Sequence, residues 1–342
     1  MKTLLVIGAS GRAAAEEARQ AGFAPTVIDL FGDIDTHAAA TVILCPREAW
    51  PEGLPALARR APPGPWMYTG GLENYPDIVG EISRDRELRG NTPATLRAVR
   101  DPFSLPSLFP GFAFPQSIPS DKLPPGRWLR KPYRGGGGLG IRDATAADVG
   151  NADVYFQEYI DGVPMSALSV GSERRGVFHQ LIGCDWLHAA PFAYCGNIGP
   201  VPLALPDAVP KCLVGAWGLD FMLVGDVPHL LEVNPRYPAS AELLARSGRG
   251  SVFGNGGAPK PAPGVVGKAI YYAPFDFRYP ADLPPSASLA DVPQPGSPVG
   301  GGSPVLTLFA HAVAPEACVS ALEARAARLD LHFAKHRTDP TP

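Results

Sequence analysis

The chain has 342 residues, of which 45% are hydrophobic and 18% are charged, and its formal net charge is −3. This length suits two or three packed globular units, and a nearly balanced charge without any basic run argues against a nucleic-acid-binding surface. The apolar run after Met1 ends at Gly8, too early for a signal peptide, and no apolar stretch approaches the roughly 20 residues that would span a bilayer.

The cysteines are scattered along the chain, and no two of them form a Cys-x-x-Cys pair. They are Cys45, Cys184, Cys195, Cys212 and Cys318. An odd number of separated cysteines is typical of free thiols in a reducing compartment, not of a disulfide framework or a thiolate metal site. The sequence therefore predicts a cytoplasmic protein.

The first segment, residues 1–90, alternates short apolar runs with an alanine-rich stretch. Residues 12–21 are predicted to be a helix, which Gly22 ends. The predicted strands are 4–7, 26–30 and 41–44. Strands separated in this way by helices or turns favour an α/β fold with a Rossmann-like parallel sheet that is covered on both faces.

In the second segment, residues 91–250, a helix is predicted to start at Asn91-Thr92-Pro93 and to end near Asp101. The strands expected beyond it are 128–131, 155–159, 165–170 and a pair from 218 to 234. A glycine-rich stretch, 248–264, leads to the third segment. That segment is predicted to contain strands 265–272 and 304–309 and a helix over 316–329.

A glycine-rich turn follows the strand at 128–131. Its four successive glycines are Gly135, Gly136, Gly137 and Gly138. Glycines expose backbone N–H groups and reach positive φ, so they can fold over phosphate oxygens, and Lys131 just before them supplies a positive charge. No Gly-Lys-Ser/Thr follows, so this is not a Walker A loop. Taken alone, the glycine run is equally compatible with a flexible hairpin turn.

A second motif, residues 156–166, is a strand end that contains Gln157, Glu158, Tyr159 and Ile160 and runs into Asp161-Gly162. A strand that ends in a carboxylate, an apolar residue and a glycine turn can offer backbone groups to the edge of a purine. An ordinary turn at Asp161-Gly162 is the alternative.

The third motif is a predicted hairpin. If Val224 and Pro228 close a three-residue loop, Asp220 lies directly across from Glu232, and Asn234 lies on the same face. The residues expected on the opposite face, toward a core, are Phe221, Leu223, Leu231 and Val233. Two close carboxylates repel one another unless a cation lies between them, and such hard oxygen ligands suit Mg²⁺.

In their order and spacing, these motifs resemble the ATP-grasp superfamily over roughly residues 90–250. The motifs are Lys-Pro before a poly-glycine turn, Gln-Glu-Tyr-Ile-x-Gly, and Asp-Phe followed by Leu-Glu-Val-Asn-Pro-Arg. The resemblance implies a Rossmann-like domain over 1–90 and an ATP-grasp domain over 91–250, with a small lobe to about 162 and a large lobe from about 163. A C-terminal segment, 265–342, would pack on the ATP-grasp domain.

The resemblance also implies roles for individual residues. Lys131 would contact the nucleotide phosphates, the four glycines would close over them, and the stretch from Gln157 through Glu158 and Tyr159 to Ile160 would hold the adenine. Asp220, Glu232 and Asn234 would bind Mg²⁺ or Mn²⁺, and Arg236 would face the transferred phosphoryl group. Family members usually carry another lysine before the glycine turn. This chain has none between Lys2 and Lys122, so Arg97 or Arg100 would replace it.

By the same resemblance, ATP would convert a carboxylate to an acyl phosphate, which an amine then attacks, in an ADP-forming ligase with small-molecule substrates. The strings 29–33 and 291–310 look similar to a subgroup linked to pterin- or furan-type one-carbon cofactors, in which glutamate is joined to an amine such as tyramine. Arg12, Tyr194 and Asn197 are candidates for specificity. His179, His188 and His229 are interpreted as structural.

Two other functions remain open. Gly8-Ala9-Ser10-Gly11 between a strand and a helix, with Asp29 at the end of the next strand, suggests NAD binding by an oxidoreductase, although that fingerprint needs glycine where Ser10 stands. The helix start beside Arg12 also forms a predicted anion site. The other function is a non-catalytic nucleotide-binding relic. Whether the protein forms a homodimer also remains open.

Overall fold

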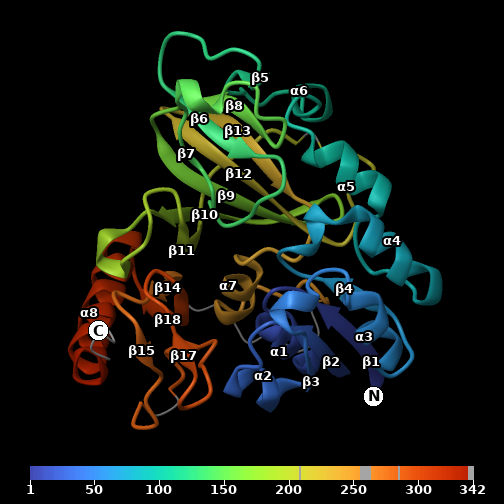
Figure 1. The fold of residues 1–342 in the computed structure, drawn as a ribbon, viewed down its shortest axis with the longest axis vertical. Coiled ribbons are helices and arrows are strands. Elements are labelled where there is room, and N and C mark those ends of the chain that lie inside the picture. Colours follow the sequence, from blue (N-terminus) through green and yellow to red (C-terminus); the bar gives the residue numbers. More distant parts are fainter. Residues whose placement is uncertain (208, 255–262, 284–285, 338–342) are drawn as a thin grey trace.

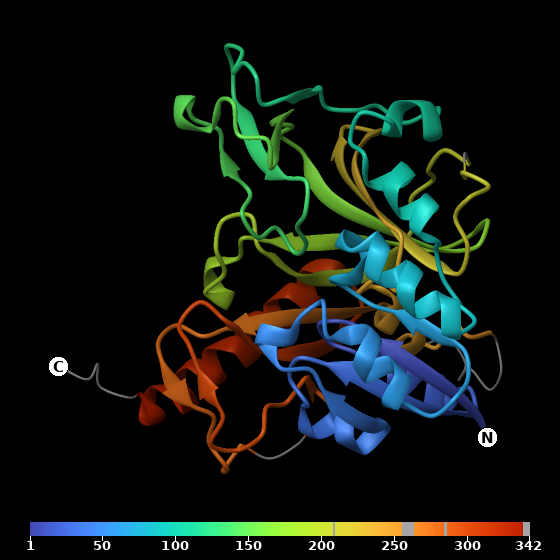
Figure 2. The same cartoon turned by 45° about the vertical axis from the view of Figure 1, so that its right-hand side comes forward.

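The computed structural model describes residues 1–207, 209–254, 263–283 and 286–337. The middle of the glycine-rich stretch 248–264 and the last five positions of the predicted C-terminal segment lie outside these ranges. Figures 1 and 2 show the N-terminal sheet at the base of the molecule, a large sheet across its middle and a small sheet at its top. No helix in the described ranges is long and apolar enough to cross a membrane.

The N-terminal sheet is parallel, with strand order β3-β2-β1-β4. Its strands are β1 (Lys2–Ile7), β2 (Phe23–Asp29), β3 (Thr41–Leu44) and β4 (Trp66–Tyr68). Its helices are α1 (Arg12–Gln20), α2 (Ile34–Ala39), α3 (Leu54–Arg60) and α4 (Pro76–Asp85), with short 3₁₀ turns η1 (Arg47–Ala49) and η2 (Leu72–Asn74). The predicted parallel sheet is confirmed.

Alternation along β1 explains why both faces of this sheet are covered. Leu4 and Val6 pack with the alanines of α1, whereas Leu5 and Ile7 pack with residues of α3 and α4 on the other face. Helix α1 approaches β2 closely because Gly11 has no side chain: a Cβ there would lie 2.4 Å from Cγ1 of Val27. The helix start is therefore fixed directly against the sheet.

The large sheet has eight strands, all paired antiparallel, in the order β13-β12-β9-β10-β11-β14-β18-β16. Its strands are β9 (Val163–Val170), β10 (Glu173–Ile182), β11 (Tyr194–Val201), β12 (Ala216–Val224), β13 (Val227–Asn234), β14 (Val265–Tyr272), β16 (Leu289–Ala290) and β18 (Pro304–Ala312). The segment after residue 264 thus continues this sheet with three strands, and its other two strands, β15 and β17, pair in a small sheet of their own.

Sequence patterns did not predict β10 and β11. Strand β10 begins with Glu-Arg-Arg-Gly and has register shifts, and β11 is interrupted by glycine and proline, so neither shows a clean apolar alternation. Both strands matter for the site, because they carry Gln180, Tyr194 and Asn197.

The small sheet has the order β5-β8-β6-β7, and the poly-glycine turn joins β6 to β7. Its strands are β5 (Ser117–Pro119), β6 (Trp128–Pro132), β7 (Arg142–Asp143) and β8 (Val154–Glu158). The remaining elements are α5 (Pro93–Arg100), α6 (Leu105–Leu108), η3 (Ala146–Asp148), η4 (Asp185–Leu187), α7 (Ala241–Arg246), β15 (Phe277–Arg278), β17 (Pro298–Val299), α8 (Pro315–Phe333) and η5 (Ala334–His336).

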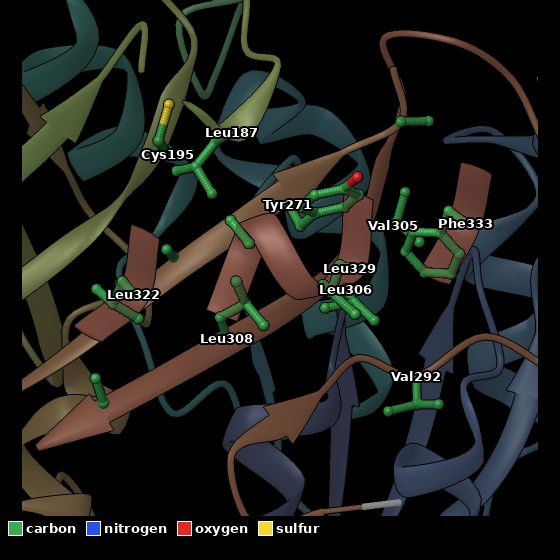
Figure 3. Packing of buried hydrophobic residues seen from close by; sticks show 14 of the residues in the cluster. Leu187, Cys195, Tyr271, Val292, Val305, Leu306, Leu308, Leu322, Leu329 and Phe333 are labelled. Carbon is green, nitrogen blue, oxygen red and sulfur yellow. The ribbon is translucent and has the colours of Figure 1, made fainter. Parts of the chain in front are cut away.

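Helix α8 packs on one face of the large sheet. Figure 3 shows Leu322, Leu329 and Phe333 of the helix among Tyr271, Leu306 and Leu308 of β14 and β18. All six side chains are at most 5% exposed. Full burial of one such side chain contributes about 1.5–3 kcal/mol, so this contact fixes the C-terminal helix on the sheet.

Candidate functional site

The hairpin of β12 and β13 places Asp220 opposite Glu232 and Gly218 opposite Asn234. The predicted three-residue loop is wrong, because Val224 pairs with Val227 around a two-residue turn. A bulge between Asp220 and Phe221 shifts the register by one residue and restores the carboxylate pair.

The same bulge corrects the predicted core face of β13. Leu230, not Leu231, points into the core and is 1% exposed, whereas Leu231 is only partly buried. Phe221 and Val233 are fully buried, as expected. Apolar packing on one face therefore holds the ribbon in place while its other face carries the polar residues.

Asp220 accepts two hydrogen bonds in this face. Gln180 Nε2 donates to Oδ1 at 2.8 Å, and Asn234 Nδ2 donates to Oδ2 at 2.8 Å. Burial, followed by the charge of Glu232, raises the pKa of Asp220 to about 7. The charge of Glu232 thus disfavours ionisation of Asp220, and a divalent cation bound between the two carboxylates would favour it.

Glu232 lies beside three basic side chains. Burial alone would raise its pKa, but the charges of Lys131, Arg100 and Arg236 hold the pKa of Glu232 below its usual value. Arg100 Nη1 is 4.0 Å from Glu232 Oε2, and 34% of the Glu232 side chain remains exposed. The carboxylate is thus ionised and accessible. The two carboxylates and the amide fit Mg²⁺ or Mn²⁺, which prefer hard oxygen ligands.

Lys131 is held in place by a neighbouring strand. It is 6% exposed, and its Nζ donates to Gln157 Oε1 at 3.0 Å, while Gln157 Nε2 donates to Ser117 Oγ at 3.2 Å. Burial lowers the pKa of Lys131, but Tyr155 and Glu232 more than offset this effect, so its pKa is raised and it stays charged. Gln157 therefore orients the lysine through a buried amide.

The poly-glycine turn is bound on two sides. The Gly135 amide donates to Asn74 Oδ1 at 3.2 Å, and the Tyr194 amide donates to the Gly137 carbonyl at 3.0 Å. Gly138 has φ +78°, and a Cβ there would lie 1.8 Å from the carbonyl oxygen of Phe192. Only glycine permits this approach, so the turn is clamped between η2 and the start of β11.

The two arginines proposed to replace the missing lysine lie in different places. Arg100 Nη2 donates to Asn74 Oδ1 at 2.8 Å and to the Gly135 carbonyl at 3.1 Å, beside the glycine turn. Arg97 is exposed and pairs with Asp77 at 2.6 Å. The structure thus brings Arg100 to the site and leaves Arg97 on the surface.

Glu73 and Asn74 are site residues that the sequence analysis missed. Glu73 is 2% exposed and accepts hydrogen bonds from Arg236 Nε at 2.9 Å and from the Gly71 amide at 2.6 Å. Arg236 Nη2 also donates to Asn234 Oδ1 at 3.1 Å. A signal existed: these residues follow two glycines at the carboxyl end of a parallel strand, where α/β proteins place ligand sites.

The stretch predicted to hold adenine has both paired and free amides. The Glu158 amide donates to Gln116 O at 2.8 Å, and the Tyr159 amide donates to Arg127 O at 3.0 Å. Within the ranges that the structure covers, the Ile160 amide has no hydrogen-bond acceptor. Glu158 is exposed, and its Oε2 accepts from the Gln116 amide at 3.2 Å.

The N-terminal candidates lie in buried networks. Arg12 is 1% exposed and forms ion pairs with Glu242, with Asp291 at 3.0 Å and with Glu16 at 3.0 Å, so its guanidinium is already paired beside the helix start where an anion site was predicted. Glu242 and Asp291 come from distant parts of the chain. Their carboxylates neutralise the charge of the Arg12 guanidinium, so this charge is not available to a ligand.

Asp29 does not face solvent as a ribose-binding carboxylate would. It is fully buried, and its Oδ1 accepts from the amides of Phe31 at 3.2 Å and Gly32 at 3.0 Å. This carboxylate therefore closes the turn after β2, which disfavours the NAD-binding interpretation.

The other candidates separate into two groups. Tyr194 donates a short hydrogen bond to Asn197, whose Nδ2 donates to Ser166 Oγ at 3.0 Å. Ser166 pairs with Asp220 across β9 and β12, so these residues adjoin the carboxylate face.

His188 contacts Asp330 at 2.7 Å, and His229 contacts the Val227 carbonyl at 3.1 Å. His179 is half-buried in β10. The contacts of His188 and His229 are structural.

Comparison with known proteins agrees with this geometry. Residues 108–240 match the family model of the ATP-grasp domain. No curated protein sequence matches the chain significantly. N5-carboxyaminoimidazole ribonucleotide synthetase from Thermus thermophilus has a similar structure, with a TM-score of 0.64 and 15% identity over 99% of each chain.

Two carboxylases are also similar in structure. The biotin carboxylase domain of 2-oxoglutarate carboxylase from Hydrogenobacter thermophilus, solved with MgADP, gives a TM-score of 0.67 at 13% identity over 93% of this chain and 88% of that one. Pyruvate carboxylase from Rhizobium etli gives 0.70 at 13% identity over 95% of this chain, which spans 37% of that enzyme. The chain therefore contains an ATP-grasp domain and has the overall fold of the ATP-grasp proteins.

Proposed function

We propose that this protein is an ATP- and Mg²⁺-dependent ligase that activates a carboxylate as an acyl phosphate for attack by an amine. The observation that carries the proposal is the face of Asp220, Glu232 and Asn234, with Lys131, Arg100 and Arg236 around it. A partly buried carboxylate pair beside three cations suits a metal–nucleotide complex, since it offers ligands for the metal and charges for the phosphates.

Residues of the small sheet would hold the nucleotide. Lys131, oriented by Gln157, would bind phosphate oxygens together with the amides of the glycine turn, and the free Ile160 amide would donate to the adenine edge. Mg²⁺ or Mn²⁺, when bound by the two carboxylates and the Asn234 amide, would neutralise negative charge on the phosphates.

The proposed reaction requires that the protein position the substrates and stabilise the negative charge of the transferred phosphoryl group. An oxygen of the acid attacks the γ-phosphorus and ADP leaves. The amine then attacks the acyl carbon, phosphate leaves, and the amine proton passes to solvent. Arg236, held by Glu73, faces the negative charge that spreads during the first step. Neither step needs a covalent protein nucleophile.

Within this class, a glutamate–amine ligase for a pterin- or furan-type one-carbon cofactor is the specific candidate. The two strings that resemble that subgroup, 29–33 and 291–310, meet in space. The Ile34 amide donates to Val292 O at 2.9 Å, and Gln294 Nε2 donates to Gly32 O at 3.1 Å. The candidate rests on the resemblance of these two strings, which these hydrogen bonds bring together.

The test is a phosphate-release screen with MgATP that crosses a panel of carboxylates, glutamate included, with a panel of amines that contains tyramine. Mass analysis then identifies the product. Release that depends on one acid–amine pair is expected, and Glu232→Gln should abolish it. Asp226→Asn is the matched control, because Asp226 lies in the exposed turn of the same hairpin. Equal turnover in Glu232→Gln and wild type would contradict the ligase mechanism.

The same screen tests the alternatives. Binding of MgATP without phosphate release for any pair would indicate a non-catalytic nucleotide-binding protein. Nucleotide fluorescence that reports NAD(H) binding, with no ATP hydrolysis, would favour an oxidoreductase.

A further inference from the structure

We propose that His332, His336 and Asp282 form a binding site for a divalent transition metal of the zinc class. The three residues lie where helix α8 ends, and the segment that carries Asp282 passes beside it. This end of the helix is far from the β12–β13 hairpin in both ribbon views (Figures 1 and 2). The site is therefore separate from the proposed nucleotide site and does not depend on the proposed function.

Distances between the ligand atoms match those around one metal ion. Oδ1 of Asp282 is 3.2 Å from Nε2 of His332 and 3.5 Å from Nε2 of His336. The three ligand atoms all lie within 4.8 Å of one another. Two ligands bonded at about 2.1 Å to a tetrahedral Zn²⁺ are about 3.4 Å apart. A single ion can therefore reach all three side chains with small rotations.

Local structure explains why the two histidines converge. They are four residues apart across the end of α8 and the 3₁₀ turn η5, so they lie on one face of the helical segment. Their ring centroids are 5.3 Å apart. This spacing on a helix is a common arrangement of paired histidine ligands.

The hydrophobic core holds both sides of the site. Phe333, next to His332, is fully buried, and its ring centroid is 6.0 Å from that of Tyr279, which is 2% exposed and lies three residues before Asp282. The approach of Asp282 to the helix is thus fixed by apolar packing, independently of any His–Asp attraction. A site whose ligands are brought together in this way loses less entropy when it binds an ion.

Without a metal, the contact between His332 and Asp282 leaves one buried nitrogen without a hydrogen bond. Nε2 of His332 is buried, yet it makes no hydrogen bond to any residue that the structure describes, because its contact with Asp282 lacks hydrogen-bond geometry. A buried polar nitrogen without a partner costs about 1–3 kcal/mol. Coordination of a metal would direct the nitrogen lone pair at a cation and remove this cost.

The ligand types select the metal. Two imidazoles and one carboxylate suit Zn²⁺ and its neighbours in the first transition series, whereas Mg²⁺ and Ca²⁺ prefer oxygen ligands only. Asp282 is 66% and His336 is 32% exposed at the side chain, so water can reach the fourth position. The bound ion would link the end of α8 to the segment that leads to β16.

The test uses the full chain without an affinity tag, with excess Mg²⁺ present to occupy the carboxylate face. Calorimetric titration with Zn²⁺ should show one equivalent bound, and Co²⁺ in its place should give the intense visible bands of four-coordinate cobalt. His336→Ala and Asp282→Ala should each weaken zinc binding by more than about ten-fold. His311→Ala, an exposed histidine on β18, should bind zinc like the wild type.

The two variants replace exposed or half-exposed side chains, and melting temperatures measured without metal would verify that they fold. Zinc should raise the melting temperature of the wild type and of His311→Ala, but not of His336→Ala. The absence of saturable zinc binding by the wild type, or equal binding by His336→Ala, would overturn the proposal.

Discussion

Nε of Arg236 donates a 2.9 Å hydrogen bond to Oε1 of Glu73, which joins the end of the β12–β13 hairpin to the turn after β4. The Glu73 side chain is 1% and that of Arg236 is 16% exposed. Arg236 also donates to Asn234, so the N-terminal unit orients two polar side chains of the proposed site. Glu73 is a positioning residue in this arrangement.

Replacing Glu73 by glutamine should slow phosphate release without unfolding the protein. The change removes the charge from a buried, charge-assisted hydrogen bond of the kind that contributes about 1.5–3 kcal/mol, so we expect kcat to fall roughly ten-fold or more. The KM for ATP should change little. Steady-state phosphate release measures both. Glu81→Gln, which alters an exposed pair with Arg59 at 3.4 Å, is the control. An unchanged kcat in Glu73→Gln would contradict the positioning role.

Gln157→Met should weaken MgATP binding. The variant keeps the volume of the side chain but removes the acceptor for Lys131 Nζ, so the buried ammonium is no longer directed toward the phosphates. We expect a loss of about ten-fold in affinity, equivalent to about 1.4 kcal/mol, measured by calorimetry. Gln20→Met, on the exposed end of α1, should bind as the wild type does. If both variants bind equally well, Gln157 does not orient the lysine.

Alanine at Gly137 and at Gly138 separates backbone strain from docking of the glycine turn. Both residues have positive φ, +62° and +78°, so either substitution strains the backbone. At Gly138 the new Cβ would meet the Phe192 carbonyl, whereas at Gly137 no atom of the described residues lies within 4 Å of it. Gly138→Ala should therefore raise the KM for ATP roughly ten-fold more than Gly137→Ala does, since 1.4 kcal/mol is ten-fold. Similar KM values would show that contact with β11 is unimportant.

Asp33→Asn should stabilise the protein at alkaline pH. Burial, then the charges of Asp291 and Asp35, raise the pKa of Asp33 to about 8, and its side chain makes no cap hydrogen bond at the start of α2. Because the folded-state pKa is raised, the stability that Asp33 contributes is complete below its unfolded pKa of about 4 and is lost as the pH rises toward 8.

Urea unfolding at several pH values tests this expectation. The gain in unfolding free energy from Asp33→Asn should be smallest near pH 4 and should reach at least about 1 kcal/mol at pH 8, since each unit of pKa shift corresponds to about 1.4 kcal/mol. Asp153→Asn, at an exposed turn, should show no such trend. A gain that is independent of pH would mean that Asp33 is ionised at little cost.

Local patterns in the sequence predicted about half of the helices and strands in the described residues, and the central part of the site. The strand at 265–272 is β14 with the same bounds, and the predicted helix over 316–329 lies within α8. Alternation with period two identified Asp220, Glu232 and Asn234 as one face, and it did so despite a wrong loop, because the bulge offset the shorter turn.

Other features depended on contacts between distant segments. Glu73, Asn74 and Gln180 reach the site through the packing of the N-terminal sheet and through β10, a strand without clear alternation. The sequence indicated that Arg12 could help to bind an anion, but in the structure it pairs with Glu242, which lies 230 positions later in the chain.

By itself, the sequence determined which residues share a strand face and which glycines adjoin a lysine, because such relations depend on neighbouring residues and backbone period. Only the tertiary structure decided which distant charges meet, because burial and ion pairing depend on how separate units pack together.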